Sequence, residues 1–324
     1  MPTQTPSQPR FSESVEARLR RWVLGIAYAF QPKRLHLIPQ LTLMTAAHVL
    51  GRTGAITHLL RRLPFDSNEG LIGISNDLSV DALLSAYQRG IFPNTHLGPM
   101  KWWSPAQRAV LFFENAHIEK GVRKQIRQAR FDVTFDEDFA AVMKACAEPR
   151  DGKTPLTWLT PRVMEAFWQL HRAGYAHSVE VWDLKPQLVG GMFGIAIGEI
   201  FFGESQFSRV RDASKIASAF LNCHLASWGF ALRDAKWLTG YHATSGFTNI
   251  DRSDFETLLG QHVCQAGRIG HWEVDETLDV AGWKPEAETS KGLRRQLALM
   301  ARGKKNEVSP LRDADQESSK RSQG

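Results

Sequence analysis

The spacing of apolar and polar positions predicts helices in the first half of the chain. Ser79 precedes an apolar helical face and Gly90 follows it. Serine is favoured just before a helix and glycine just after one, so the pattern predicts a helix with defined ends. The stretch 91–103 contains two prolines and a glycine, which favour an irregular loop. Further helices are expected at 123–129 and 139–147.

The second half of the chain predicts strands. Stretches rich in Val, Ile and Phe at 177–182, 187–197 and 199–204 alternate with turns and should form an antiparallel meander. A helix that Asp212 is expected to cap follows, and then a strand at 230–238. This order describes an acetyltransferase-like core. The prediction is an α+β fold, with a small N-terminal domain followed by an acetyltransferase-like (GNAT) mixed sheet and flanking helices.

These patterns divide the chain into four segments. A basic, apolar helical extension covers 1–62, a small N-terminal domain covers 63–150, and the GNAT-like acyltransferase domain covers 151–265. The remaining residues, 266–324, turn polar and charged, so we expect a largely disordered tail.

The N-terminal extension joins positive charge to apolar residues. Arginines between positions 18 and 21 precede the apolar run 22–30, and a second apolar stretch covers 41–60. An amphipathic helix of this kind more often packs on the main domain, and packing is what we expect. The alternative is a peripheral contact of residues 18–30 with a membrane surface.

Charge and cysteine content narrow the classes of protein. The 324 residues carry a formal net charge of +6, which favours a polyanionic partner, either nucleic acid or an anionic membrane. Cys146, Cys223 and Cys264 are far apart and form no CxxC pair, which argues against a disulfide framework or a thiolate zinc site. The chain shows no apolar run long enough to span a membrane and no secretory signal pattern. We therefore expect a cytoplasmic protein.

Several common chemistries lack their sequence signatures. The chain contains neither GxGxxG nor GxxxxGK[ST], and it contains no HExxH. Its eleven histidines show no spacing typical of metal ligands. We therefore expect neither a cofactor nor a metal.

Two stretches carry candidate binding chemistry. The adjacent indoles of Trp102 and Trp103 could stack on a base, although such a pair is more often a hydrophobic lid or an interface plug. An apolar strand leads directly into Glu204, Ser205 and Arg209, just before the helix after Asp212. Free N–H groups at a helix N-terminus favour an anion or a polarised carbonyl. The alternative is a turn in which Glu204 and Arg209 pair with each other.

The strand at 230–238 carries charge between apolar residues. With a period of two, Asp234 and Lys236 share one face with Leu232, and Arg233 lies on the other face. Such a pair is either a structural bridge or a site with shifted pKa values, and the bridge is the better interpretation from the strand alone.

Many short motifs in one order resemble the bacterial leucyl/phenylalanyl-tRNA–protein transferase family over about 63–259. The matching text comprises Asp77-Leu78-Ser79, Ala86-Tyr87-Gln88-Arg89-Gly90-Ile91-Phe92-Pro93, Trp102-Trp103-Ser104-Pro105, Arg108-Ala109-Val110-Leu111, Thr157-Trp158, 177–182, 188–194, Phe202-Gly203-Glu204-Ser205, Phe207-Ser208-Arg209 and Ala213-Ser214-Lys215. The resemblance implies an aminoacyltransferase that moves Leu, Phe or Met from charged tRNA to the N-terminal amine of proteins beginning with Arg or Lys. Those proteins are thereby marked for proteolysis. Its partners would be aminoacyl-tRNA and such a protein.

The resemblance also implies roles for individual residues. Trp102 and Trp103 would lie where the terminal adenosine of the tRNA docks. An apolar pocket for the transferred side chain would be lined by Trp158, Met192 and Phe201. The remaining residues that we assign to substrate binding are Ser205, Phe207 and Arg209.

The same resemblance places the catalytic residues. Glu204 would face the acceptor and the reacting centre, and Asp234 stands where the family has its catalytic aspartate. Asp234 could draw a proton from the attacking amine. Lys236 would be its partner.

Several positions depart from the family pattern. Lys236 replaces a glutamine, and a protonated lysine accepts no hydrogen bond. Other departures are Ser75, Asn76, Asn94, Gln206, Thr239, Gly240, Tyr241 and Asp251. The alternatives are therefore a diverged acyltransferase that acts on another amine, such as a lipid, or a non-catalytic paralogue that binds tRNA or protein.

Overall fold

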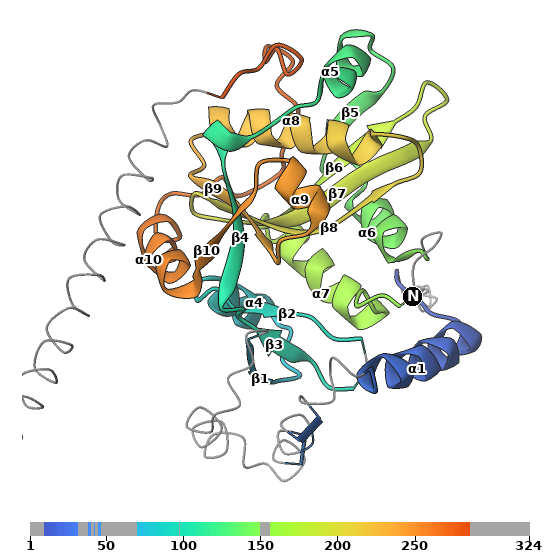
Figure 1. Cartoon of the computed structure of the whole chain (residues 1–324). Coiled ribbons are helices and arrows are strands. Elements are labelled where there is room, and N and C mark those ends of the chain that lie inside the picture. The colour runs from blue at the N-terminus through green and yellow to red at the C-terminus, as the bar shows by residue number, and fades with distance from the viewer. Residues whose placement is uncertain are drawn as a thin grey trace, which may run out of the picture.

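The computed structural model describes residues 10–31, 70–96, 98–149 and 156–285, together with positions 38, 39, 42, 45 and 46. The fold is of the α+β class, as the sequence predicted, and contains a seven-stranded and a three-stranded sheet (Figure 1). The strands are β1 (Leu71–Ile74), β2 (Phe92–Pro93), β3 (Lys101–Trp103), β4 (Gln107–Phe112), β5 (Asp132–Phe135), β6 (Ala176–Trp182), β7 (Leu188–Ile197), β8 (Ile200–Ser208), β9 (Leu232–Lys236) and β10 (Thr248–Asp251). The helices are α1 (Val15–Ala29), α4 (Val80–Tyr87), α5 (Lys120–Arg127), α6 (Phe139–Ala147), α7 (Pro161–Arg172), α8 (Ala213–Ser227), α9 (Gly240–Thr244) and α10 (Arg252–His262), with a 3-10 turn at Phe113–Asn115.

The large sheet has the order β10-β4-β9-β8-β7-β6-β5. The predicted antiparallel meander is confirmed as β6, β7 and β8, whereas β9 pairs with β8 in parallel. Helix α8 covers one face of the sheet, and α6 and α7 cover the other (Figure 1). Side chains along β8 point alternately to the two faces of the sheet. The neighbours Phe201 and Phe202 accordingly belong to separate buried clusters, one on each face.

Two strands of the large sheet come from the segment that we assigned to the N-terminal domain. β4 lies between β10 and β9, and β5 forms the opposite edge next to β6. The sheet is therefore built jointly by residues before and after position 150. The boundary between 63–150 and 151–265 stays a prediction.

The expectation of an irregular loop at 91–103 was wrong at both ends of this stretch, although 94–96 and 98–100 form no helix or strand. β2 and β3 lie in this stretch and form the small sheet with β1, in the order β1-β3-β2. A proline is tolerated because β2 is an edge strand, where one missing N–H does not break the central pairing.

The ends of α8 and β9 differ from the sequence prediction. Asp212 has a left-handed backbone with φ of 69°, and its side chain caps no N–H of α8, whereas the Ser214 N–H donates to Ser208 Oγ at 3.2 Å. β9 is shorter than the predicted strand at 230–238, because the backbone of Lys236 turns to a φ of 65°. The shared face of the strand therefore ends at Lys236.

The segment after residue 265 packs on the core as far as the structure describes it. Trp272 is fully buried, and its ring stacks on His177 with 3.6 Å between centroids. The Trp272 N–H donates to Asp136 Oδ2 at 2.9 Å. The prediction of a disordered tail was therefore wrong for 266–285. The rest of the predicted tail lies outside the described residues.

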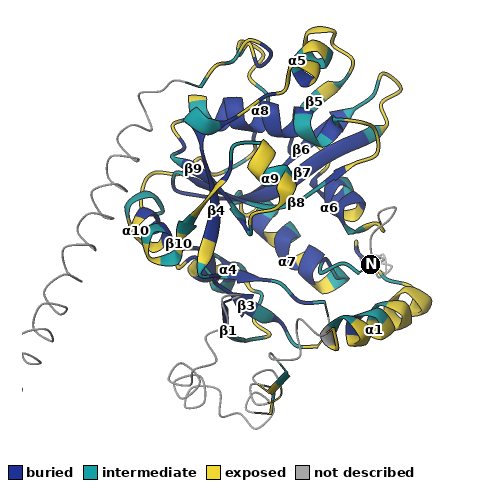
Figure 2. Cartoon of the chain, in the orientation of Figure 1, coloured by how far each residue is buried: buried dark blue, intermediate teal, exposed yellow. Residues whose placement is uncertain are grey.

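The N-terminal extension contains the predicted helix, but its apolar side faces outward. α1 leaves Val15, Leu19, Trp22, Val23 and Ile26 exposed (Figure 2). The helix does contact the main domain, where the Tyr28 ring lies 5.0 Å from that of His96, but the expected packing of its apolar face is not found. The second apolar stretch, 41–60, lies almost entirely outside the described residues. Among the helices that are described, none has the length and apolar character needed to cross a membrane.

Candidate active site

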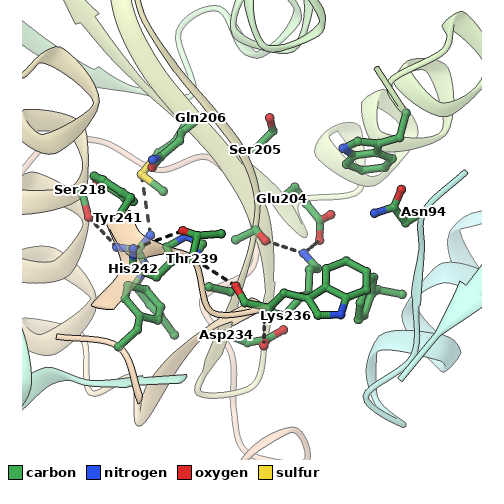
Figure 3. A pocket seen from close by; sticks show the side chains of 18 of the residues that line it. Asn94, Glu204, Ser205, Gln206, Ser218, Asp234, Lys236, Thr239, Tyr241 and His242 are labelled. Carbon is green, nitrogen blue, oxygen red and sulfur yellow. Dashed lines mark hydrogen bonds and ion pairs between the residues drawn. The ribbon is translucent and has the colours of Figure 1, made fainter. Parts of the chain in front are cut away.

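A cavity of about 540 Å³ opens where two parallel strands stop pairing. Within the described chain, β8 and β9 pair at Ile200 with Leu232, at Phe201 with Arg233 and at Phe202 with Asp234, and the pairing ends there. Residues just beyond this point line the cavity from both strands (Figure 3). Six of the predicted site residues are among them: Trp158, Met192, Glu204, Ser205, Asp234 and Lys236.

An ion pair bridges the two strands at the mouth of this gap. Lys236 Nζ lies 2.5 Å from Glu204 Oε1 and donates to the Gly203 carbonyl at 2.5 Å. Tyr87 Oη, at the end of α4, donates to the same Glu204 oxygen at 2.6 Å. The sequence led us to pair Lys236 with Asp234, and the structure corrects this, because the ammonium contacts Glu204 instead.

Burial acts on both members of this pair in opposite directions. Desolvation raises the pKa of Glu204, although the nearby Lys236 ammonium opposes the rise. Desolvation lowers the pKa of Lys236, and the Glu204 carboxylate opposes the fall. Burial also raises the pKa of Tyr87 well above its ordinary value, which keeps its hydroxyl a donor. The pair is therefore closer to exchanging its proton than the same groups would be in water.

Asp234 is held in a second, deeper ion pair. Arg108 of β4 donates from Nε to Oδ1 at 2.6 Å and from Nη2 to Oδ2 at 2.7 Å, and both side chains are almost fully buried. The Lys236 backbone N–H also donates to Asp234 Oδ1, at 2.9 Å. Asp234 thus connects β4 to the backbone turn that orients the Lys236 side chain. Both carboxylate oxygens of Asp234 accept hydrogen bonds from these donors.

Arg108 was missed by the sequence reasoning, although it belongs to a matched motif. The available signal was an arginine inside an otherwise apolar strand, Arg108-Ala109-Val110-Leu111. Its third donor, Nη1, reaches the Gly90 carbonyl at 2.8 Å. A charged side chain in an apolar strand indicates a buried partner, but the strand does not say which one.

The opposite wall of the cavity is formed around Arg233. Its Nη1 donates to Ser218 Oγ at 3.0 Å and to Asn222 Oδ1, both on α8. Its Nη2 lies 3.9 Å from the Met192 sulfur. Burial lowers the pKa of Arg233 to about 10, so the guanidinium stays charged at neutral pH. From the sequence we expected Arg233 on the opposite face of the strand from Asp234, and we assigned it no role.

The remaining predicted substrate residues lie away from the cavity wall. Trp102 and Trp103 are buried in the small sheet, where their indole N–H groups donate to the carbonyls of Ser75 and Asn94. The stacking role of these two indoles stays a prediction.

Phe201, Phe207 and Arg209 also stay predictions as substrate residues. Phe201 and Phe207 are buried in the core. Arg209 pairs at the surface with Glu148 at 2.8 Å, so the alternative pairing of Glu204 with Arg209 is excluded. As for metals, the described residues contain no group of three or more His, Cys, Asp or Glu side chains placed to hold an ion.

Comparison with known proteins assigns the residues that build this cavity to one family. The model of the leucyl/phenylalanyl-tRNA protein transferase matches residues 110–260, and the model of its N-terminal domain matches residues 76–106. The leucyl/phenylalanyl-tRNA–protein transferase of Pseudomonas syringae pv. syringae (strain B728a) is 48% identical over 197 residues, which cover 60% of this chain and 85% of that protein.

This chain belongs to the leucyl/phenylalanyl-tRNA protein transferase family.

Other relatives give the same result. The transferases of that name from Azotobacter vinelandii and Cellvibrio japonicus are 46% and 44% identical over 195 and 199 residues, covering 85% and 84% of those proteins. The resemblance found in the sequence is therefore confirmed. A solved structure, that of L-PGS from Bacillus licheniformis, covers 48% of each chain at 10% identity with a TM-score of 0.29, a likeness too low to bear on the fold.

Six of the nine positions that we expect to depart from the family pattern line the cavity, whereas Ser75, Asn76 and Asp251 do not. The cavity is lined by Asn94, Gln206, Lys236, Thr239, Gly240 and Tyr241 (Figure 3).

Proposed function

We propose that this protein transfers an amino acid from a charged tRNA to the N-terminal amine of a protein and so forms a peptide bond. Membership of the transferase family supports the reaction class. The observation that carries the proposal for this chain is the buried Glu204–Lys236 pair on the wall of the cavity. An acid and a base in hydrogen-bond contact suit a reaction that moves one proton.

The reaction needs the amine neutral and the oxyanion stabilised. The amine nitrogen forms a bond to the ester carbonyl carbon, and the bond from that carbon to the ribose oxygen breaks. In our proposal Glu204 accepts the proton that the amine loses, and Lys236 supplies a proton to the departing ribose oxygen. The Lys236 ammonium also stabilises the negative charge on the tetrahedral intermediate.

Asp234 acts in this proposal as a positioning residue. Its carboxylate binds the backbone N–H of Lys236 and the Arg108 guanidinium, which leaves little capacity to take a proton from substrate. The left-handed backbone of Lys236 costs about 1 kcal/mol or more, and contacts such as this one hold it in place.

We also propose that the large sheet is acetyltransferase-like (GNAT). The order of the elements supports this, because an antiparallel meander leads through α8 into β9, which lies parallel to β8. The reacting groups then lie where these two parallel strands stop pairing.

The direct test uses purified protein with leucyl- or phenylalanyl-tRNA and an Arg-initiated peptide. The expected product is the peptide extended by one residue, detected by mass. Glu204→Gln should lower the rate by about 100-fold. As a matched control, Glu119→Gln removes the acid of the surface pair with Lys215 and should leave the rate unchanged. Transfer to a lipid or another amine, together with no transfer to any peptide, would mean that this amine and not a protein is the acceptor. No transfer to any acceptor would mean that the protein binds its partners without catalysis.

A further inference from the structure

Arg233 is a buried cation whose charge is not balanced by any described carboxylate. The residue is 4% exposed, and no ion pair joins it to an acidic side chain in the described part of the chain. Its hydrogen-bond partners, Ser218 and Asn222, are neutral. A buried guanidinium without a counter-charge is unfavourable in an empty site. Such a group points to an anion that the site binds.

The other charges on the cavity wall cancel in pairs. Glu204 is neutralised by Lys236, and Asp234 is neutralised by Arg108. Burial lowers the pKa of His242, which also lines the cavity, so this imidazole is neutral at neutral pH. Arg233 is thus the surplus positive charge of the wall. A ligand that cancels it must bring a negative group.

Two donors of the guanidinium, Nε and Nη2, have no oxygen acceptor among the described residues. Nη1 donates to Ser218 and Asn222, whereas the hydrogen-bond partner of Nη2 within the described chain is the Met192 sulfur alone, at 3.9 Å. Among the described residues, Arg233 Nε is buried without a hydrogen-bond partner. Nε and Nη2 form the side of an arginine that binds a carboxylate with two parallel hydrogen bonds. The Met192 side chain is unbranched and can shift to admit such a group.

The surroundings of Arg233 indicate which part of the substrate brings the carboxylate. The guanidinium lies beside Met192 and 5.8 Å from the Phe201 ring, two residues that we assign to the pocket for the transferred side chain. The guanidinium is on the face of β9 that α8 covers, because it contacts Ser218 and Asn222, whereas Asp234 pairs with Arg108 on the other face. Tyr241 lines the same cavity, and its hydroxyl is buried without a hydrogen-bond partner among the described residues, so it offers a second donor.

We propose that Arg233 binds the side-chain carboxylate of the transferred amino acid, so that the preferred donor is aspartyl- or glutamyl-tRNA. This inference rests on the proposed aminoacyl transfer and specifies its substrate. The side chains of Leu, Phe and Met, which the family implies, would bury the guanidinium without a counter-charge. An acidic side chain satisfies it with two hydrogen bonds.

The test compares four donors and two variants. Wild-type protein receives tRNA charged with Glu, Asp, Leu or Phe, together with an Arg-initiated peptide. We expect kcat/KM for an acidic donor to exceed that for Leu and Phe by about 10-fold or more. Arg233→Leu should reverse this order. Arg211→Leu, a control at a side chain that is 94% exposed, should leave it unchanged.

Binding gives a readout that does not depend on catalysis. Stable 3′-amide analogues, glutamyl-amino-adenosine and leucyl-amino-adenosine, can be titrated by calorimetry into wild type, Arg233→Leu and Arg233→Lys. Wild type should bind the glutamyl analogue about 10-fold more tightly, and the lysine variant should keep only part of the difference because its ammonium lacks the planar fork.

The outcomes separate this inference from the proposed function. Efficient transfer of Leu or Phe by wild type, with acidic donors rejected, would overturn the role of Arg233 and leave aminoacyl transfer standing. No transfer from any charged tRNA would overturn the proposed function, and the analogues would still decide the role of Arg233. An equal loss of affinity for every donor in Arg233→Leu would indicate a phosphate contact and overturn the carboxylate assignment.

Discussion

Lys236 joins β9 to β8 at the point where the two strands stop pairing, because its Nζ contacts both Glu204 Oε1 and the Gly203 carbonyl at 2.5 Å. The pair closes a gap between parallel strands with a charge-assisted hydrogen bond instead of backbone pairing. The same contact places an acid and a base on the wall of the cavity. Stability and activity are therefore coupled at this position.

The coupling predicts the result of a double-mutant cycle. Glu204→Gln or Lys236→Gln alone leaves a buried charge unpaired, and each should lower the free energy of unfolding by about 3 kcal/mol. The double variant should be clearly less destabilised than the sum of the two, as measured by urea denaturation. The surface pair of Glu119 and Lys215 is the matched control, and its single variants should change stability by less than about 1 kcal/mol.

Two results would contradict this interpretation. Additive losses would mean that Glu204 and Lys236 do not depend on each other. An increase in transfer to Arg-initiated peptides by Lys236→Gln would mean that the glutamine of the family still fits this site and that Lys236 supplies no needed proton.

Asp234→Asn should affect stability as well as activity. The substitution leaves buried Arg108 without its counter-charge. We expect a loss of about 3 kcal/mol, or a fall in Tm of roughly 6 °C or more. Combining it with Arg108→Gln should recover part of the Tm without restoring transfer. An unchanged Tm with lost transfer would instead support a direct catalytic role for Asp234.

Glu180 predicts a pH dependence of stability that is separate from the active site. Its carboxylate is fully buried on β6 and accepts hydrogen bonds from Ser178 and Thr134, and burial raises its pKa to about 7. The folded state therefore binds more protons than the unfolded state between pH 4.5 and 7, and stability falls as pH rises through that window.

Glu180→Gln should remove this loss. At pH 8 the variant should be more stable than wild type by up to about 3 kcal/mol, and at pH 4 the difference should nearly vanish. Thermal unfolding across this range measures the effect. Exposed Glu256→Gln is the control and should give the wild-type pH profile. A destabilised Glu180→Gln at pH 8 would show that the ionised carboxylate is required by its two hydroxyl donors.

Binding of tRNA should weaken steeply with salt. The net charge of +6 suits phosphate contacts, and six such contacts would lower affinity about 1000-fold between 50 and 200 mM salt. A fluorescence titration of charged tRNA at several salt concentrations gives the slope. A slope near zero would count against phosphate contacts and against tRNA as the donor carrier.

The same titration with vesicles tests the membrane alternative for α1. Its exposed apolar residues lie on a helix that also carries arginines. Salt-sensitive binding to anionic vesicles that is abolished by Leu19→Asp would show that α1 is a membrane contact. Equal binding to neutral and anionic vesicles, or no binding to either, would exclude an electrostatic contact between the α1 arginines and a membrane.

The sequence by itself determined the elements whose signals are local. Alternating apolar residues and turns predicted β6, β7 and β8, and ordered short motifs identified the family. The resemblance to that family pointed to six residues that line the cavity. These features follow from periodicity and residue type over a few positions, which a single chain displays directly.

The tertiary structure decided which charged groups meet. Arg108 and Asp234 are 126 positions apart, and Glu204 and Lys236 come from different strands, so no local pattern pairs them. The partners were set by the order of strands in the sheet, which places β4 and β8 on the two sides of β9. The same order leaves Arg233 on the α8 face without a described carboxylate. Each of these placements affects stability because the groups are buried. A charge in the interior is costly unless the fold places an opposite charge or a hydrogen-bond partner next to it.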